Sequence, residues 1–400
     1  MYDAIIVGAR CAGSPTAMLL ARKGYKILLV DKAGFPSDTV STHVIWPHGA
    51  EIMGRWGLLD SLAATNCPPV AVNMTFDVGP FALKGGVTVA NDGRGGFCPR
   101  RTVLDKLLVD AAVAAGAELR EDFTVEDLVW SDDRVAGIKG RSPGGRRVED
   151  RAAVVIGADG SHSVVARAVR ASEYDAIPPL ATFYYSYYSG FDATDIEQYV
   201  RDFQGAACFP TNDGLTAIVA VWPSSRFSEI RADIEGHVRK VHESAPSVAD
   251  RMRRATREDK WFGTAGVANY FRKPYGPGWA LVGDAGYEKD PITAQGISDA
   301  FIDAENLSEA LDAGHSGRRP LDQALAAYHA SRDARAKPMY HFTCDLARLE
   351  PPPPPLRALF GALHGNPEAT NGFFAAITGA RPLQEFMSAE NIGRIVGAAS

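Results

Sequence analysis

The sequence predicts an α/β protein in which a discontinuous domain, built on a parallel sheet, carries an inserted antiparallel sheet and a C-terminal helical segment. Three observations predict this fold class. The chain opens with a strand, a small-residue turn, a helix and a second strand, which is the pattern of a βαβ unit. A tyrosine-rich β-run occupies residues 182–190. Helical pieces fill residues 315–400.

Composition limits the classes of function. The 400 residues exceed the usual size of one domain, which favours two domains that share a cleft. The net charge of −6, with no Lys/Arg block, argues against nucleic acid or an anionic membrane as a partner. No apolar run is long enough to span a membrane and no basic leader opens the chain, so we expect a cytoplasmic protein. The five cysteines lack Cys-x-x-Cys spacing, so we expect neither disulfides nor a metal site.

The N-terminal turn indicates a Rossmann-like nucleotide site. A strand over 3–7 leads into a helix over 13–23, and a second strand ends at Asp31. Glycines in such a turn let the backbone approach a pyrophosphate, and the acidic residue can accept the ribose hydroxyls. Arg10 stands where the second glycine of G-x-G-x-x-G is expected, so our hypothesis is that its guanidinium turns aside to bind pyrophosphate or adenine. The residues expected to bind the cofactor here are Gly8, Arg10, Ala12, Gly13, Asp31 and Lys32.

Two further segments extend the predicted site. The Arg100-Arg101 pair opens an amphipathic helix that runs to about Ala115, and a basic pair at a helix start opposes the macrodipole unless an anion answers it. Arg101 is therefore an expected cofactor contact. Far along the chain, a strand ends at Gly283-Asp284, before a loop and a helix over 297–311. Two distant phosphate- and sugar-contacting segments indicate one long cofactor, which we expect to be FAD.

These segments together resemble the FAD-dependent monooxygenase superfamily of the para-hydroxybenzoate hydroxylase fold, whose relatives include geranylgeranyl-reductase-like enzymes and flavin-dependent halogenases. The resemblance rests on four motifs in the expected order, namely the Gly8–Gly13 turn with Asp31, Arg101-x-x-x-Asp105, Asp159-Gly160 and Gly283-Asp284. It implies that Asp31 holds the adenosine ribose, that Arg101 lies along the cofactor and that Asp284 binds the ribityl chain. Asp159 would belong to a loop used for both FAD and NAD(P)H.

The resemblance also assigns the loop after Asp284. Pro291 would stand near the face of the flavin where oxygen reacts. The residues that would line the ring are Thr293, Ala294, Gln295 and Gly296. Two positions depart from the family pattern. Ala166, with Arg167 next to it, stands where an arginine is usual, and this weakens the expectation that NAD(P)H reduces the flavin directly. Tyr287 stands where many members carry a histidine.

The middle of the chain is expected to form the substrate side. Tyr185 and Tyr187 share one face of the aromatic strand with Phe183, and we expect one face to pack in the core while the other lines an aromatic or polyketide-like pocket. Runs at 205–210 and 215–223 predict a hairpin. His43 is the favoured proton-handling residue because a histidine ordinarily titrates near working pH.

Domain limits follow from these assignments. Residues 351–355, five consecutive prolines, predict a polyproline II connector. The FAD-binding domain is expected to comprise 1–75, 97–172 and 261–345, the substrate domain 76–96 and 173–260, and the C-terminal helical segment 346–400.

The function expected from the resemblance is hydroxylation of a small aromatic or polyketide-like substrate through a flavin C4a-hydroperoxide, with O₂ and NAD(P)H. Three alternatives stay open. The first is a halogenase, which would share the fold, although the Trp-x-Trp-x-Ile-Pro marker of one halogenase group is absent. The second is a prenyl-reductase-like enzyme, which would carry a Cys-Gly pair where Val40–His43 stand. The third is a flavin-binding or ligand-binding protein without catalytic activity. A homodimer contact and a separate flavin reductase are also left open.

Overall fold

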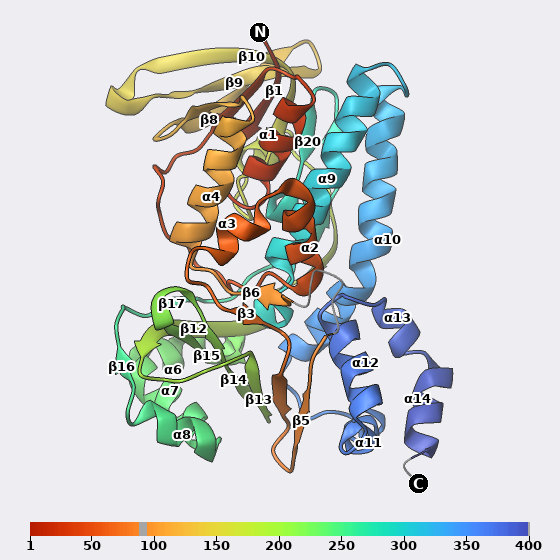
Figure 1. Ribbon diagram of the computed structural model, residues 1–400. Coiled ribbons are helices and arrows are strands. Elements are labelled where there is room, and N and C mark those ends of the chain that lie inside the picture. Colours follow the sequence, from red (N-terminus) through yellow and green to blue (C-terminus); the bar gives the residue numbers. More distant parts are fainter. Residues whose placement is uncertain (88–93, 399–400) are drawn as a thin grey trace.

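The computed structural model describes residues 1–87 and 94–398 (Figure 1). The predicted substrate segment 76–96 includes 88–93, which lie outside the described residues. Within the described part, the parallel-sheet half and the antiparallel-sheet half lie one above the other, and the C-terminal helices lie beside the antiparallel sheet. The predicted α/β fold class is confirmed.

A mostly parallel sheet forms the frame of the first half. Its order is β19-β20-β10-β1-β2-β7, and all neighbours are parallel except the edge strand β19. Val7 is in register with both Val30 and Gly157, so the turns that follow β1, β2 and β10 meet at one edge. The strands are β1 (Tyr2–Val7), β2 (Ile27–Val30), β7 (Glu118–Arg120), β10 (Arg147–Gly157), β19 (Tyr275–Gly276) and β20 (Trp279–Leu281).

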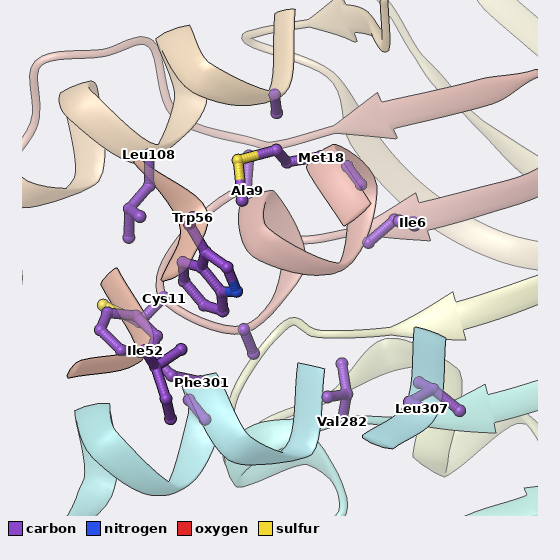
Figure 2. Close-up of a cluster of buried hydrophobic side chains, with 14 of the residues drawn as sticks. Ile6, Ala9, Cys11, Met18, Ile52, Trp56, Leu108, Val282, Phe301 and Leu307 are labelled. Carbon is purple, nitrogen blue, oxygen red and sulfur yellow. The ribbon is translucent and has the colours of Figure 1, made fainter. Parts of the chain in front are cut away.

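Alternate residues of these strands bury the two faces of the sheet against different elements. Ile6 and Leu29 lie in a cluster with the helices on one face, and Figure 2 shows this packing around Trp56. Ile5 and Leu28 lie in a second cluster on the other face, against β8, β9 and α5. The covering elements are α1 (Gly13–Arg22), α2 (Pro47–Trp56), α3 (Leu59–Ala63), α4 (Arg101–Ala114), α9 (Gly296–His315), β8 (Thr124–Ser131), β9 (Arg134–Arg141) and α5 (Val164–Ala168).

The second half is built on an antiparallel sheet of order β16-β12-β15-β14-β13-β4-β5, with β17 also beside β12. The predicted hairpin is confirmed, because β14 and β15 pair antiparallel. β4 and β17 begin at Met74 and Phe262, so strands of this sheet extend beyond the predicted substrate segments. The strands are β4 (Met74–Asp77), β5 (Ala82–Gly85), β12 (Ala181–Ser189), β13 (Glu197–Arg201), β14 (Gln204–Pro210), β15 (Thr216–Pro223), β16 (Thr256–Arg257) and β17 (Phe262–Thr264).

Both faces of the tyrosine-rich strand β12 are covered. Tyr185 and Tyr187 belong to a hydrophobic cluster shared with the C-terminal helices. Tyr184 and Tyr188 belong to another cluster, with residues of α6 (Phe227–Ala232), α7 (Ile234–Glu243) and α8 (Pro246–Met252). Helices therefore cover both faces of β12, and the pocket expected on one of them stays a prediction.

Separate elements join the two halves. A small sheet, β11-β18-β21, belongs to neither large sheet and consists of β11 (Glu173–Ile177), β18 (Asn269–Arg272) and β21 (Tyr287–Glu288). Because β11 pairs with β18, it lies outside the large antiparallel sheet in which residues 173–177 were expected. The long helix α10 (Leu321–Ala347) runs from the parallel-sheet half to the C-terminal helices (Figure 1).

The C-terminal segment is helical, with α11 (Pro354–Leu363), α12 (Pro367–Ile377), α13 (Leu383–Phe386) and α14 (Ala389–Gly397). The predicted polyproline connector over 351–355 needs correction, because Pro354 and Pro355 form the first turn of α11. Proline fits there because the first helical N–H groups need no intrahelical partner. Among the helices of the described chain, none is both long and apolar enough to cross a membrane.

Candidate active site

The turn after β1 is packed so closely that neither Gly8 nor Gly13 could carry a side chain. Gly8 has a φ of +102°, and a Cβ there would lie 2.4 Å from the carbonyl oxygen of Ala158. A Cβ on Gly13 would lie 1.8 Å from the carbonyl oxygen of Gly8. The start of α1 is therefore folded back onto the turn, which is the geometry that presents backbone amides to a pyrophosphate.

The two distant motifs predicted to share one cofactor meet in space. A Cβ on Gly283, which has a φ of +61°, would lie 2.8 Å from the Cβ of Ala12 in the glycine turn. The backbone after β20 is thus within van der Waals reach of the turn after β1. This close approach fits a cofactor long enough to contact both segments.

Asp31 is fixed at the end of β2 by backbone amides. Its carboxylate accepts hydrogen bonds from the amides of Ala9 at 2.7 Å and Ala33 at 2.8 Å, while Lys32 is exposed. Asp31 therefore lies directly beside the glycine turn. Its predicted contact to ribose, and that of Lys32 to the cofactor, stay predictions.

A buried carboxylate orients two arginines beside the turn. Asp105 is fully buried and accepts hydrogen bonds from Arg10 and from Nε and Nη2 of Arg101, at 3.1 and 2.8 Å from the latter. Asp105 is therefore the negative group that compensates the positive charge at the start of α4. The guanidinium of Arg10 also donates to the carbonyl and hydroxyl oxygens of Ser37, so it turns aside from the glycine turn. Its contact to pyrophosphate or adenine stays a prediction.

Two acidic residues line the approach to this turn. Oδ2 of Asp159 accepts from the amide of Val164 at 2.7 Å, whereas its buried Oδ1 has no hydrogen-bond partner in the described part of the chain. Asp284 is exposed, yet enough protein surrounds it that burial raises the pKa of its carboxyl to about 6, against the opposing charges of Lys289 and Arg101. An exposed side chain so surrounded lies in a recess.

The recess contains a second acidic group. Burial and the charge of Asp284 raise the pKa of Glu288 to about 9, so this carboxyl keeps its proton at neutral pH. Oε2 of Glu288 is buried and has no partner within the described residues. A protonated carboxyl with a free oxygen, next to an ionisable one, offers both a donor and an acceptor to the hydroxyl groups of a cofactor.

The loop predicted to line the flavin ring is held by its own Asp290 and by the helices α10 and α12. Asp290 caps the short helix Pro291–Thr293 by accepting from the amide of Ile292 at 3.0 Å. Gln295 donates to the carbonyl oxygen of Ile377 in α12 at 2.9 Å, and Thr293 shares a hydrogen bond of 2.8 Å with Thr343 in α10. After the left-handed Ala294, with φ of +52°, the exposed Gly296 opens the 20-residue helix α9.

Trp46 ties the segment that contains His43 to this loop. Its backbone amide donates to Oγ of Ser298 at 3.1 Å, and its Nε1 donates to the carbonyl oxygen of Thr293 at 3.1 Å. His43 is therefore only three residues away from a double contact with the predicted flavin loop. The structure brings these two predicted regions together.

His43 is buried in a left-handed conformation with φ of +65°, and its Nε2 lies 2.7 Å from the hydroxyl of Tyr187. Burial, together with the charges of Arg101 and Arg100, lowers the pKa of His43 to about 3. The prediction that His43 titrates near working pH is therefore wrong, since a charge here would be desolvated and repelled by two cations. A role for the neutral imidazole stays a prediction.

Tyr185 and Tyr187 both lie on the face of β12 turned toward His43, and both rings contact the His43 ring edge-on. The Tyr185 hydroxyl accepts from the amide of Ser41 at 3.3 Å, and burial raises the pKa of Tyr185 to about 12. Burial raises the pKa of Tyr187 further. Both phenols are therefore protonated at neutral pH, and their predicted contact to substrate is untested.

Two residues that the sequence analysis did not select lie at the same place. The backbone amide of Arg100 donates to Oδ1 of Asn212 at 2.8 Å, and its guanidinium carbon lies 4.2 Å from the centre of the Tyr187 ring. Asn212 is buried in the turn between β14 and β15. The only sequence signal for Arg100 was its position beside Arg101 at the helix start.

Two open cavities lie away from this site. One, of about 240 Å³, is lined by residues of α12, α13 and α14, including Arg381 and Arg394. The other is a groove of about 590 Å³ between α3 and α4, lined by Leu58, Val103 and Leu107 among others. Neither contains a predicted site residue, so the motifs and the contacts between them define the site better than cavity size does.

A family model described as "FAD binding domain" matches residues 1–343. A digeranylgeranylglycerophospholipid reductase of Methanosarcina mazei is 28% identical over 334 residues, 78% of this chain and 76% of the relative.

Solved structures share the fold. A myxobacterial chondrochloren halogenase is 19% identical, with a TM-score of 0.80 over 100% of this chain and 96% of that one. A "probable FAD-dependent monooxygenase" of Pseudomonas aeruginosa is 20% identical, with a TM-score of 0.73 over 94% of this chain and 99% of that one. At these identities the likeness shows the fold alone.

The residues present fit FAD. The glycine turn excludes side chains where a pyrophosphate would bind, the Gly283-Asp284 segment contacts that turn, and the unpartnered oxygens of Asp159 and Glu288 offer hydrogen-bond capacity. FAD is therefore the cofactor and the protein is an oxidoreductase.

Proposed function

Because this chain belongs to the FAD-binding domain family, we propose that it is an FAD-dependent reductase that saturates a carbon–carbon double bond in an apolar, isoprenoid-like substrate. Reduced FAD, when bound, supplies the hydride equivalent for such a reaction. The chain has to supply a proton, an apolar binding surface and the exclusion of water. The proposal rests on how His43, Tyr187 and the surrounding cluster meet these needs.

The observation that carries the proposal is the protonation state of His43 and of the neighbouring Tyr187. His43 is neutral at working pH because its pKa is about 3, and the Tyr187 phenol 2.7 Å away stays protonated. Such a pair can donate a proton to a carbon that has gained a hydride, whereas hydroxylation of a phenol benefits from a base that removes a proton. A histidine with a pKa of about 3 is a weak base for removing that proton, so the pair suits reduction better than hydroxylation.

The surface around this pair suits an apolar chain. One hydrophobic cluster unites Val44 and Trp46 of the His43 segment, Ala294 of the flavin loop, and Phe183 and Phe209 of the antiparallel sheet. The C-terminal helices add Phe360, Phe373 and Phe374. Burying an apolar substrate here would gain roughly 25 cal/mol per Å² of apolar surface. The name of the Methanosarcina relative, a reductase of a digeranylgeranyl lipid, agrees with this substrate class.

A second candidate is hydroxylation with O₂ and NAD(P)H. One observation favours it: the Cys-Gly pair that prenyl-reductase relatives carry is absent, and Val40–His43 stand in its place. His43 and Tyr187 would then orient a phenolic substrate instead of protonating an alkene.

An anaerobic half-reaction separates the candidates. The purified protein, with its bound FAD reduced by dithionite, is mixed without oxygen with geranylgeraniol and, separately, with a phenol. We expect flavin reoxidation and a product two mass units heavier with the isoprenoid. A product that forms only when O₂ is admitted and is 16 mass units heavier overturns reduction and supports hydroxylation. A product that requires added bromide or chloride overturns both.

A further inference from the structure

Arg100 connects the two halves of the molecule at the entrance to the site. It directly precedes α4 in the parallel-sheet half, and its backbone amide is bound to Asn212 of the antiparallel sheet at 2.8 Å. Its Nη2 lies 3.1 Å from Oδ2 of Asp259, between β16 and β17, and 3.7 Å from Oδ2 of Asp38, in the loop after β2. One side chain is thus held by carboxylates from both halves.

The guanidinium held in this way covers the ring of Tyr187. Its central carbon is 4.2 Å from the ring centroid, which is the geometry of a cation–π contact, and the Tyr187 hydroxyl lies 2.7 Å from Nε2 of His43. Nε of Arg100 is buried and has no hydrogen-bond partner in the described part of the chain. The position of the guanidinium over the ring is therefore fixed by Asp38, Asp259 and the ring itself.

The charges around Tyr187 act in opposite directions. Burial, the neighbouring Tyr185 and the carboxylate of Asp38 disfavour a phenolate at Tyr187, whereas Arg100 favours it. Arg101 acts on the neighbouring His43 and Tyr185. Among the groups that act on Tyr187, Arg100 is the cation that makes loss of its proton easier.

We propose that Arg100 is the positioning residue that makes Tyr187 an effective proton donor, by holding a positive charge over its ring from both halves of the protein. This inference rests on the proposed reduction. In that step the hydride adds to one carbon of the double bond and the Tyr187 proton adds to the other. The electron pair of the O–H bond stays on the phenolate oxygen beside Arg100, and water returns the proton.

The test compares the acidity of the residue-187 phenol with and without the charge of Arg100. Tyr187 is replaced by 3,5-difluorotyrosine, a more acidic phenol whose ionisation can be followed by ultraviolet absorbance. The titration is repeated with Arg100→Met, with Arg100→Lys and with the control Lys106→Met, which removes an exposed cation from the same helix. We expect Arg100→Met to raise the phenol pKa by about one unit, Arg100→Lys to raise it less, and Lys106→Met to leave it unchanged.

The rate of the anaerobic half-reaction gives a second readout. In the protein with natural Tyr187, Arg100→Met should slow flavin reoxidation by about tenfold, and difluorotyrosine at position 187 should recover most of the loss. Equal phenol titrations with and without Arg100 overturn the inference, as does a rate loss that the more acidic phenol does not recover. Because the titration needs no substrate, failure of the proposed reduction is seen separately, in the absence of reduced product.

Discussion

The predicted cofactor side and the proposed substrate side of this site are built on different physical principles. On the cofactor side, the turn after β1 and the segment at Gly283 touch through backbone and small residues, and Asp284 stays exposed in its recess. On the substrate side, His43, Tyr185 and Tyr187 are buried among aromatic rings. The first side depends on glycines, whose missing side chains allow the backbone segments to approach closely. The second depends on the buried environment of each side chain.

This difference determines which kind of change each side tolerates. An added methyl group in the glycine turn meets a backbone carbonyl that cannot move far, so cofactor binding should fail abruptly. A removed hydroxyl on the substrate side leaves the packing intact and changes only the chemistry. Substitutions of each kind therefore probe whether the two sides are separable.

The largest effect is expected for Gly13→Ala. Its Cβ would lie 1.8 Å from the carbonyl oxygen of Gly8, so α1 must shift and the turn loses its shape. We expect the purified variant to carry almost no FAD by its 450 nm absorbance. The control is Gly361→Ala in α11, where a Cβ meets nothing within 4 Å and FAD content should be unchanged. Full flavin content in Gly13→Ala would show that this turn is not the pyrophosphate site.

A smaller and more selective effect is expected on the substrate side. Tyr187→Phe removes the hydroxyl that contacts His43, and should slow the anaerobic half-reaction by roughly 10²-fold while FAD binding stays normal. Tyr188→Phe is the matched control on the same strand, because its buried hydroxyl has no partner within the described residues. Equal rates in the two variants would contradict a proton-donating role for Tyr187.

The smallest effect is a pH dependence of FAD affinity. The pKa of Asp284 in the apoprotein is about 6, and a carboxylate accepts hydrogen bonds from ribityl hydroxyls better than the protonated acid does. Protonation of Asp284 therefore opposes binding. FAD affinity should be constant between pH 7 and 8, where Glu288 keeps its proton, and should weaken by no more than about tenfold per pH unit below pH 6. Fluorescence titrations of apoprotein with FAD measure this, and Asp284→Asn should bind more weakly with this pH dependence removed. A wild-type affinity that is flat from pH 5 to 8 would remove Asp284 from the binding site.

The same division explains how much could be predicted from sequence. The glycine turn, Asp31 and Gly283-Asp284 are local patterns, because a tight turn or a strand end is specified by adjacent residues. The state of His43 was mispredicted, because its pKa depends first on burial and then on the charges of Arg101 and Arg100, and all of these come from residues distant in the chain.

Contacts between residues distant in the chain also explain which other site features could not be predicted from sequence. The sequence shows that Arg10 departs from the glycine pattern, but its partner Asp105 lies in α4, far along the chain. The role inferred for Arg100 depends on carboxylates from two distant loops, which no local pattern brings together.

The family match ends at residue 343, whereas the helices that supply Phe360, Phe373 and Phe374 to the substrate-side cluster come later. Helices outside the matched region thus form one wall of the substrate-side cluster. Gln295, in the predicted flavin loop, donates a hydrogen bond to Ile377 and is one connection between the matched region and this wall. Chimaeras that exchange the C-terminal helices between relatives would therefore alter substrate preference most cleanly when this contact is preserved.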